Sequence, residues 1–471
     1  MEKPTIILAT SNGVGMGHLA RASAVALALK EVANPIIVSM AGGIAEVPAF
    51  MGIRCEYIPG KDRMWMSREK WDIYLRDRLL ALVEETGAKV LSFDGVVPYP
   101  GVIAAKNANP NLKLVWVRRG LWQKKPQRFI LGLQSKMMDR IIEPGDIARA
   151  YDFGPTANRK DSVLTAPVSL FRKEDALSRD DARRTLGLDL NRPTALVQLG
   201  TGDSDVNEKM TAALSGLIGW KDLQVILTKA PVDKDGKSLV PEGLDLKVVR
   251  YFPLANVLHA FDAGICATGY NGVHELLPAQ VPTVFVSNIR GTDDQEARAK
   301  WCNDFGFALR ADQANLADIT EKVKMLQDPV VRKGLSDKCA ELPNTTGGQE
   351  IAAMLYQLAV EQKPARAKTF TFLRLMAQDH INRGLRHVAN LGLRRVALVY
   401  RFLNPHIKVQ EIDQALPVFG DQITATELHP LIKSATRFEH MIQGASVNYR
   451  KRREEIAFAA YGKEMIVTKT K

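Results

Sequence analysis

The first third of the chain alternates short apolar runs with segments whose apolar residues recur at helical spacing. Helices are predicted over His18–Lys30 and Ser67–Glu85, and strands over Thr5–Thr10, Pro35–Ser39, Val90–Phe93 and Leu114–Val117. Such alternation is typical of a doubly wound parallel sheet covered by helices. Residues 1–165 are therefore predicted to form a Rossmann-like domain of the α/β class.

The same alternation resumes after a looser, polar segment. Strands are predicted over Ala195–Leu199, Gln224–Thr228, Lys247–Val249, Ala263–Ala267 and Pro282–Val286, and a closing helix over Gly348–Glu361. Residues 166–363 are predicted to form a second Rossmann-like domain, and residues 364–471 an appended extension. Because ligands of open α/β sheets bind outside the carboxyl ends of the strands, we expect the site where the two domains face each other.

Composition places the chain among ordinary globular proteins. Apolar residues make up 46% and charged residues 25% of the 471 residues, as in soluble proteins. The first strand begins at Thr5 without a preceding signal segment, and no run of about 18 apolar residues predicts a transmembrane helix. The four cysteines form neither a C-x-x-C pair nor a disulfide framework. These features predict a reduced, cytoplasmic setting.

A glycine-rich turn follows the first predicted strand and opens into a helix. It contains Gly13, Gly15 and Gly17, where glycine lets the backbone approach a ligand and the helix N-terminus offers N–H groups to an anion. The G-x-G-x-G spacing departs from the dinucleotide fingerprint. The only Gly-Lys-Ser, at Gly236–Ser238, lacks the first glycine of a P-loop. Neither common nucleotide motif is present.

Two titratable residues fall at carboxyl ends of strands in the first domain. His18 lies at the tip of the glycine-rich turn, where an imidazole could accept a proton at neutral pH. Asp94 ends the strand that begins at Val90 and could hold that imidazole in one tautomer. The structural alternatives are a histidine that caps its helix and an aspartate that initiates a turn.

The second domain carries the densest set of small and polar residues. Gly200, Thr201 and Gly202 follow a strand and either face a diphosphate or form an ordinary turn. The segment Ala267–Glu275 then joins a small-residue turn to a helix-borne carboxylate, and Asp293–Ala299 adds a second polar cluster. This order suits a nucleotide, its diphosphate and a sugar. His274 points about 100° away from Glu275 on a helix and is predicted to pack or to lie on the surface, without a role in the chemistry.

These residues resemble the GT-B nucleotide-sugar glycosyltransferases, specifically family 28 and its relatives, over roughly residues 1–363. The resemblance implies that Phe252 flanks the base, that Glu275 holds the ribose hydroxyls, and that Asp294 and Gln295 contact the transferred sugar. It further implies nucleotide and diphosphate contacts from Thr268, Gly269, Asn271 and Gly272, and a catalytic base at His18 with Asp94 as its partner. The family generally needs no metal for catalysis, and neither a metal nor a cofactor is expected.

The chain departs from the family pattern at three positions. Ala267 stands where a histidine contacts phosphate, Tyr270 where a tryptophan stacks, and Gln280 where a glycine precedes Val-Pro. The reaction that the resemblance implies is inverting transfer from a nucleotide-diphospho sugar, a UDP-sugar, to a hydroxyl of a lipid-linked or cell-envelope glycan. The alternatives are a UDP-sugar 2-epimerase or hydrolase of the same fold, and a non-catalytic nucleotide-sugar binding protein.

Basic charge is concentrated in the extension. Residues 365–471 hold 18 of the 64 Lys and Arg residues but 9 of the 52 Asp and Glu residues, and hence nine of the twelve net positive charges. Residues 370–403 place apolar residues at helical spacing among arginines, which predicts a basic amphipathic helix on an anionic membrane or packed on the core. Basic residues beside Trp65, Trp71 and Trp122 suit the headgroup boundary of an anionic bilayer or a lipid-diphosphate acceptor, the alternative being solvated loops with partly buried tryptophans. Glu454 and Glu455 after Arg450–Arg453 argue against nucleic-acid binding.

Overall fold

The computed structural model describes most of the first 381 residues. The described ranges are 2–11, 17–40, 46–60, 68–124, 128–200, 206–228, 240–288, 292–361, 368–378 and 381. Residues 1–60 and 74–369 form one compact unit, and residues 61–73 and 370–471 form a second. Both sheets lie in the first unit. Most of the predicted extension lies outside the described residues, and its helix over residues 369–378 is described by itself.

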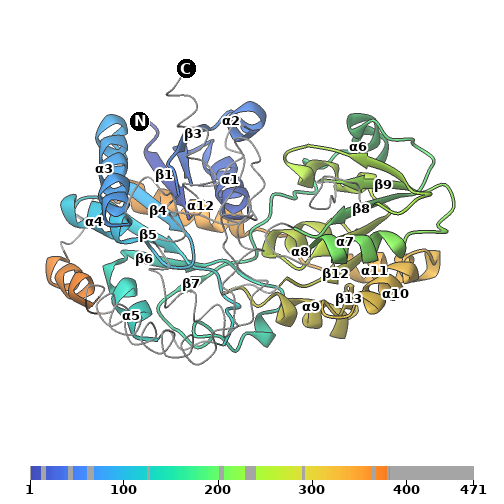
Figure 1. The fold of residues 1–471 in the computed structure, drawn as a ribbon. Helices are drawn as coiled ribbons and strands as arrows, with labels where there is room; N and C mark the ends of the chain where they lie inside the picture. Colours follow the sequence, from blue (N-terminus) through green and yellow to red (C-terminus); the bar gives the residue numbers. More distant parts are fainter. Residues whose placement is uncertain are drawn as a thin grey trace, which may run out of the picture. The chain divides into compact units, whose positions relative to one another are not determined.

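The first sheet has seven parallel strands in the order β3-β2-β1-β4-β5-β6-β7 (Figure 1). Its central strands β1, β4 and β5 are buried along nearly their whole length, which explains their continuous apolar runs. The strands are β1 (Thr5–Thr10), β2 (Asn34–Ser39), β3 (Arg54–Tyr57), β4 (Val90–Asp94), β5 (Lys113–Val117), β6 (Arg140–Glu143) and β7 (Val163–Leu164).

The second sheet has six parallel strands in the order β10-β9-β8-β11-β12-β13. The strands are β8 (Thr194–Gln198), β9 (Gln224–Leu227), β10 (Asp245–Val248), β11 (Ala263–Ala267), β12 (Thr283–Val286) and β13 (Leu309–Ala311). Two parallel sheets with helices between their strands confirm the predicted fold class. The predicted boundaries at residues 165 and 363 stay predictions.

Helices lie between most of the strands in sequence and follow the last strand, β13. They are α1 (Gly17–Leu29), α2 (Glu46–Met51), α3 (Arg68–Thr86), α4 (Pro100–Ala108), α5 (Arg128–Met137), η1 (Arg149–Tyr151), α6 (Arg179–Leu186), α7 (Val206–Ser215), η2 (Leu254–Ala260), α8 (Tyr270–Leu276), α9 (Gln295–Asp304), α10 (Leu316–Met325), α11 (Pro329–Cys339) and α12 (Gly347–Val360). Among the described residues, every helix is too short or too polar to cross a lipid bilayer.

Helix α12 follows the second sheet in sequence but packs on the first. It contacts α1, β1, β4 and β5, and Figure 1 shows it beside β1 and β4. Lys113 of β5 donates to the carbonyl of Leu358 at 2.9 Å and pairs with the Glu361 carboxylate at 3.0 Å. The chain therefore crosses back to the first sheet at its closing helix.

Each sheet reverses its winding direction at one pair of central strands. In the first sheet this switch lies between β1 and β4, and in the second between β8 and β11. Ligands of open α/β sheets bind at such switch points, outside the carboxyl ends of the strands. His18 and Asp94 lie at the first switch point, and Gly200 and Thr268 at the second.

Candidate functional site

His18 and Asp94 are in direct contact at the first switch point. His18 is the second residue of α1 and Asp94 the last residue of β4, and β1 and β4 are neighbours in register. The His18 Nδ1 atom lies 2.7 Å from the Asp94 Oδ1 atom. The imidazole is 15% exposed and the carboxylate 8% exposed. The fold thus joins two residues that are 76 positions apart.

The electrostatics of this pair leave one imidazole nitrogen free to accept a proton. Burial alone would raise the pKa of Asp94, but the charge of Arg21 and the hydrogen bond from His18 hold it well below its usual range. An ionised carboxylate accepts only, so we assign the His18 proton to Nδ1 and the lone pair to Nε2. Burial lowers the pKa of His18 below 6.5, against the opposing effect of Asp94. His18 is therefore neutral at pH 7.

Arg21 completes this cluster and was not predicted from the sequence. Its Nε and one terminal nitrogen donate to the two Asp94 oxygens at 2.9 and 2.6 Å. The same terminal nitrogen lies 2.8 Å from His18 Nδ1. The spacing of three residues from His18 on one helix face was the available signal.

The nucleotide motif of the second domain forms the turn between β11 and α8. Thr268 is fully buried and its hydroxyl lies 3.3 Å from that of Ser287. Gly269 precedes α8, and a Cβ atom there would meet no atom within 4 Å. A Cβ atom on Gly272 would lie 3.3 Å from the Ala267 carbonyl. Glycine therefore keeps the start of α8 open at Gly269 and tightly packed at Gly272.

Asn271 brings this turn into contact with the glycine-rich turn of the first sheet. Its side-chain Nδ2 donates to the backbone carbonyl of Gly17 at 3.1 Å. Its Oδ1 atom is buried and has no hydrogen-bond partner. The two predicted half-sites therefore meet at this residue.

Glu275 is half-buried in the last turn of α8. Burial raises the pKa of its carboxyl to about 8, although a hydrogen bond from the Leu170 backbone opposes the shift. In the ligand-free protein this carboxyl is therefore mostly protonated at pH 7. Ribose hydroxyls as donors would favour its ionised form.

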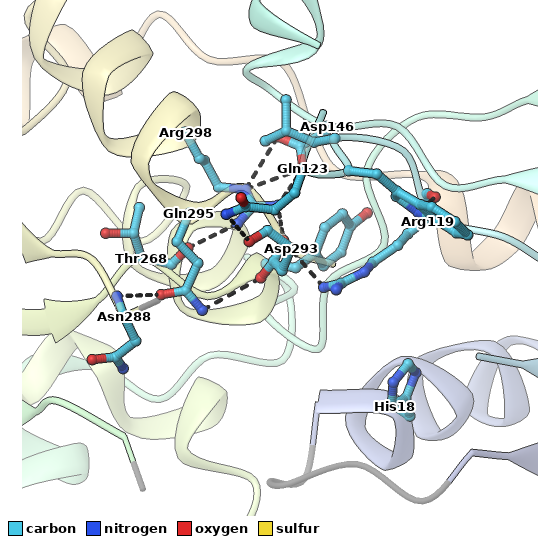
Figure 2. A network of polar contacts seen from close by, with 12 residues as sticks. His18, Arg119, Gln123, Asp146, Thr268, Asn288, Asp293, Gln295 and Arg298 are labelled. Carbon is cyan, nitrogen blue, oxygen red and sulfur yellow. Dashed lines mark hydrogen bonds and ion pairs between the residues drawn. The ribbon is translucent and has the colours of Figure 1, made fainter. Parts of the chain in front are cut away.

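Asp294 and Gln295 are already engaged in hydrogen bonds at the start of α9. Asp294 caps the helix by accepting from the Ala297 N–H at 3.0 Å. Gln295 is buried, and its amide oxygen accepts from the Asn288 N–H at 2.9 Å (Figure 2). These bonds orient the two side chains that the resemblance assigns to the sugar. Their role in sugar binding stays a prediction.

A buried ionic network surrounds the same helix and was also missed by sequence reasoning. Arg298 is fully buried and pairs with Asp146 at 2.8 Å and Asp293 at 3.0 Å. It also donates to the Thr268 carbonyl at 2.8 Å. Arg119, which follows β5, reaches Asp293 at 3.2 Å from the opposite side (Figure 2). Asp293 is thus shared by two arginines.

Backbone pairing reinforces this network. The Gln123 N–H donates to the Thr292 carbonyl at 2.7 Å, and the Asp294 N–H donates to the Leu121 carbonyl at 3.0 Å. Loops that follow β5 and β12 therefore run against each other.

The remaining predicted donor residues are placed only in part. Gly200 follows β8 with a φ of 82°, a conformation that favours glycine. Phe252 is half-buried and packs against the core of the first unit. Gly15, Thr201 and Gly202 lie outside the described residues.

The three departures from the family pattern have distinct structural settings. Tyr270 is buried, and its hydroxyl donates to the Gly145 carbonyl at 2.7 Å, so its ring packs in the core instead of facing a ligand. Gln280 has a φ of 58°, a left-handed conformation that explains the family's glycine. Ala267 is the last residue of β11 and half-buried.

His274 is a packing residue, one of the two settings that its position on α8 predicted. It is buried, its Nδ1 donates to the Tyr270 carbonyl at 2.7 Å, and its Nε2 accepts from the Ile147 N–H at 3.1 Å. Both ring nitrogens are therefore satisfied. Within the described ranges, no cluster of three His, Cys, Asp or Glu side chains is placed to hold a metal ion.

Two of the three tryptophans that suggested a lipid headgroup boundary are buried. Trp122 is 3% exposed and its indole N–H donates to the Arg119 carbonyl at 2.8 Å. Trp71 is fully buried, and Trp65 lies outside the described residues. The headgroup interpretation of Trp71 and Trp122 is therefore wrong, because their rings cover protein instead of solvent.

Comparisons with known proteins identify enzymes of similar sequence. No protein-family model matches the chain. The UDP-N-acetylglucosamine–N-acetylmuramyl-(pentapeptide) pyrophosphoryl-undecaprenol N-acetylglucosamine transferase of Rhodococcus opacus is 24% identical over 384 residues, covering 78% of this chain and 99% of that enzyme. The enzyme of the same name from Nocardioides sp. is 26% identical over 233 residues, covering 48% of this chain and 60% of that enzyme.

Solved structures establish the fold. A glycosyltransferase from Rickettsia africae superposes with a TM-score of 0.53 at 12% identity, over 77% of this chain and all (100%) of that one. A putative UDP-N-acetylglucosamine 2-epimerase from Listeria monocytogenes superposes with a TM-score of 0.51 at 13% identity, over 74% of this chain and 94% of that one. The chain therefore has the GT-B fold, as the sequence predicted, and the relatives that it resembles in sequence are N-acetylglucosamine transferases.

Proposed function

We propose that the chain transfers a sugar from a UDP-sugar to a hydroxyl of a lipid-linked acceptor, with inversion at the anomeric carbon. The observation that carries the proposal is the 2.7 Å contact between His18 Nδ1 and Asp94. It leaves Nε2 of a neutral imidazole as the base for the acceptor hydroxyl. The names of the Rhodococcus and Nocardioides relatives support the donor and acceptor classes.

In this mechanism the second domain holds the donor. Glu275 would accept the ribose hydroxyls, and the open turn at Gly269 and the N-terminus of α8 would face the diphosphate. The Oδ1 atom of Asn271, which has no hydrogen-bond partner in the protein, would accept a hydrogen bond from the nucleotide sugar. As the diphosphate leaves, backbone N–H groups at this turn would stabilise its growing charge, while His18 takes the acceptor proton.

The test is a donor screen followed by product analysis. Uridine diphosphate and its sugars are expected to raise the melting temperature more than guanosine or adenosine diphosphates, because a ligand that binds only the native state stabilises it. Incubation of the stabilising UDP-sugar with a polyprenyl-diphosphate-linked sugar is expected to give a glycosylated lipid of inverted anomeric configuration. Sugar transfer from another nucleotide only, or retention of configuration, would contradict the proposal.

A 2-epimerase or hydrolase is the second candidate, because the fold superposes on the putative Listeria 2-epimerase. Such an enzyme needs no acceptor. Incubation with the UDP-sugar alone would then release UDP or an epimerised sugar at the rate seen with acceptor present. We expect negligible turnover without acceptor.

The raised pKa of Glu275 predicts a pH dependence of nucleotide binding. If ribose binds the ionised carboxylate, affinity for UDP should rise as the pH increases and level off above about 8, the pKa of the free protein. Below that pH the dissociation constant should increase by up to about tenfold for each pH unit, as binding weakens. Calorimetry across this range measures both the affinity and the proton released.

The Glu275→Gln variant is the control for this dependence. It should bind UDP more weakly by roughly 1.5–3 kcal/mol at high pH, because an uncharged amide replaces a charged acceptor. It should also show only the titration of the nucleotide itself. An unchanged affinity and pH profile would refute the assignment of Glu275 to the ribose.

We further propose that the extension binds anionic membranes. In the described part of its helix, Phe370 is 80% exposed and Leu373 is 59% exposed, and their spacing of three residues places them on one face of the helix. Phe370→Ser with Leu373→Ser in the full chain should reduce flotation with phosphatidylglycerol vesicles severalfold. Phe153→Ser, at a residue 76% exposed in the first unit, is the matched control. Equal flotation of all three proteins would exclude this surface.

A further inference from the structure

We propose that Arg21 is a positioning residue for the base: its guanidinium fixes the Asp94 carboxylate and balances its charge, so that Asp94 orients His18 without keeping it protonated. This inference rests on the proposed function of His18. Arg21 itself is 4% exposed and lies one helical turn after His18 on α1. It would act through Asp94 and His18 and touch no substrate.

The geometry of Arg21 fits this role. Its fork binds both Asp94 oxygens at 2.9 and 2.6 Å, an arrangement that fixes the carboxylate plane better than one bond. Its guanidinium carbon lies 5.1 Å from the centre of the Tyr270 ring, and the Tyr270 hydroxyl is fixed by Gly145 and by the Val168 N–H. Arg21 is therefore held from two sides.

The charge of Arg21 determines what Asp94 does to the imidazole. A buried carboxylate alone beside a histidine favours the protonated imidazolium, which cannot act as a base. Arg21 neutralises that carboxylate and lies 2.8 Å from His18 Nδ1, where a second positive charge is unfavourable. Among the described residues, Arg119 in the loop after β5 is the other charged group that lowers the pKa of His18. Asp293 is a second carboxylate whose charge, like that of Asp94, raises the pKa of Arg21.

The variants Arg21→Met and Arg21→Lys distinguish the effect of the positive charge of Arg21 from the effect of its two hydrogen bonds to Asp94. Arg21→Met should raise the pKa of His18, and with it the acid limb of the kcat/KM profile, by about one pH unit or more. Arg21→Lys keeps the charge but loses the fork, so the acid limb should stay in place while kcat falls roughly tenfold from misalignment. The KM for the donor should be unchanged in both variants.

Arg183→Lys is the matched control, since Arg183 is fully buried and pairs with Asp262 in another part of the fold. It should move neither the acid limb nor kcat. If Arg21→Met loses activity while the acid limb of its kcat/KM profile does not move, the proposal is overturned. A loss of that kind is what a merely structural arginine such as Arg183 would give.

A titration of labelled His18 by nuclear magnetic resonance, assigned with His18→Ala, separates this proposal from the proposed function. It reports the pKa and the protonated nitrogen of His18 without turnover. An unchanged His18 pKa in Arg21→Met overturns the role of Arg21 even if His18 proves essential. Normal turnover of His18→Ala removes the base assignment even if Arg21 controls that pKa.

Discussion

Replacement of His18 by alanine is expected to lower the rate of sugar transfer by about 10²–10⁴-fold, the usual contribution of a positioned base. His18 lies at the first switch point, whereas the residues proposed to hold the donor follow β8 and β11. Donor binding should therefore persist in His18→Ala, with a calorimetric dissociation constant for UDP close to that of the unaltered protein. Initial rates at saturating donor and acceptor measure the effect.

Two further variants define what this result means. Asp94→Asn should also lower kcat strongly, because an amide can present its N–H to Nδ1 and favour the wrong tautomer. His259→Ala changes a histidine of η2, whose Nδ1 lies 3.0 Å from the Leu177 carbonyl, and should leave kcat unchanged. Turnover of His18→Ala within a factor of two of the unaltered protein would exclude His18 as the base.

The sequence predicted the central strands because their signal is local. Strands β1, β4, β8 and β11 are continuous apolar runs that the sheets bury on both faces, and their predicted bounds agree with the structure within one residue. Strands β3, β6, β7 and β13 were missed. The residues of β3 and β7 are half-buried or exposed, so no run of apolar residues marks them, and β6 and β13 are only four and three residues long.

The candidate site likewise contains residues that the sequence predicts and residues that it does not. His18, Asp94 and Asn271 could be named because they follow predicted strands at places where parallel sheets bind ligands. Arg21 and Arg298 could not, since a charged residue in a helix is normally solvated. Only the folded chain shows that Arg21 faces Asp94, and that Arg298 faces Asp146 across 152 positions of sequence. Long-range ion pairs leave no pattern in a single sequence.

The packing of α12 on the first sheet could not be predicted from the sequence for a similar reason. The helix presents an apolar stripe that includes Ile351, Leu355 and Leu358, which predicts that it packs but not on which sheet. Its anchor is Lys113, whose ammonium reaches carbonyls at the end of the helix.

Replacement of Arg298 by leucine is expected to lower the free energy of unfolding by about 3–5 kcal/mol, the loss usually seen when one partner of a buried ion pair is removed. Asp146 and Asp293 would stay buried without Arg298, whose charge, together with the larger effect of Arg119 on Asp293, now outweighs burial and holds their pKa values low. The Thr268 carbonyl would lose its donor as well. Denaturation in urea, followed by two spectroscopic probes, measures the loss.

The charge argument also predicts a partial rescue. Asp146→Asn and Asp293→Asn in the Arg298→Leu background should restore part of the lost stability, because they remove the carboxylates left without Arg298. Each of the two substitutions alone, with Arg298 present, should be destabilising. Lys333→Ala, which breaks an exposed pair with Asp337, should leave stability nearly unchanged. If the triple variant were less stable than Arg298→Leu, packing around Arg298 and not charge balance would hold this part of the fold together.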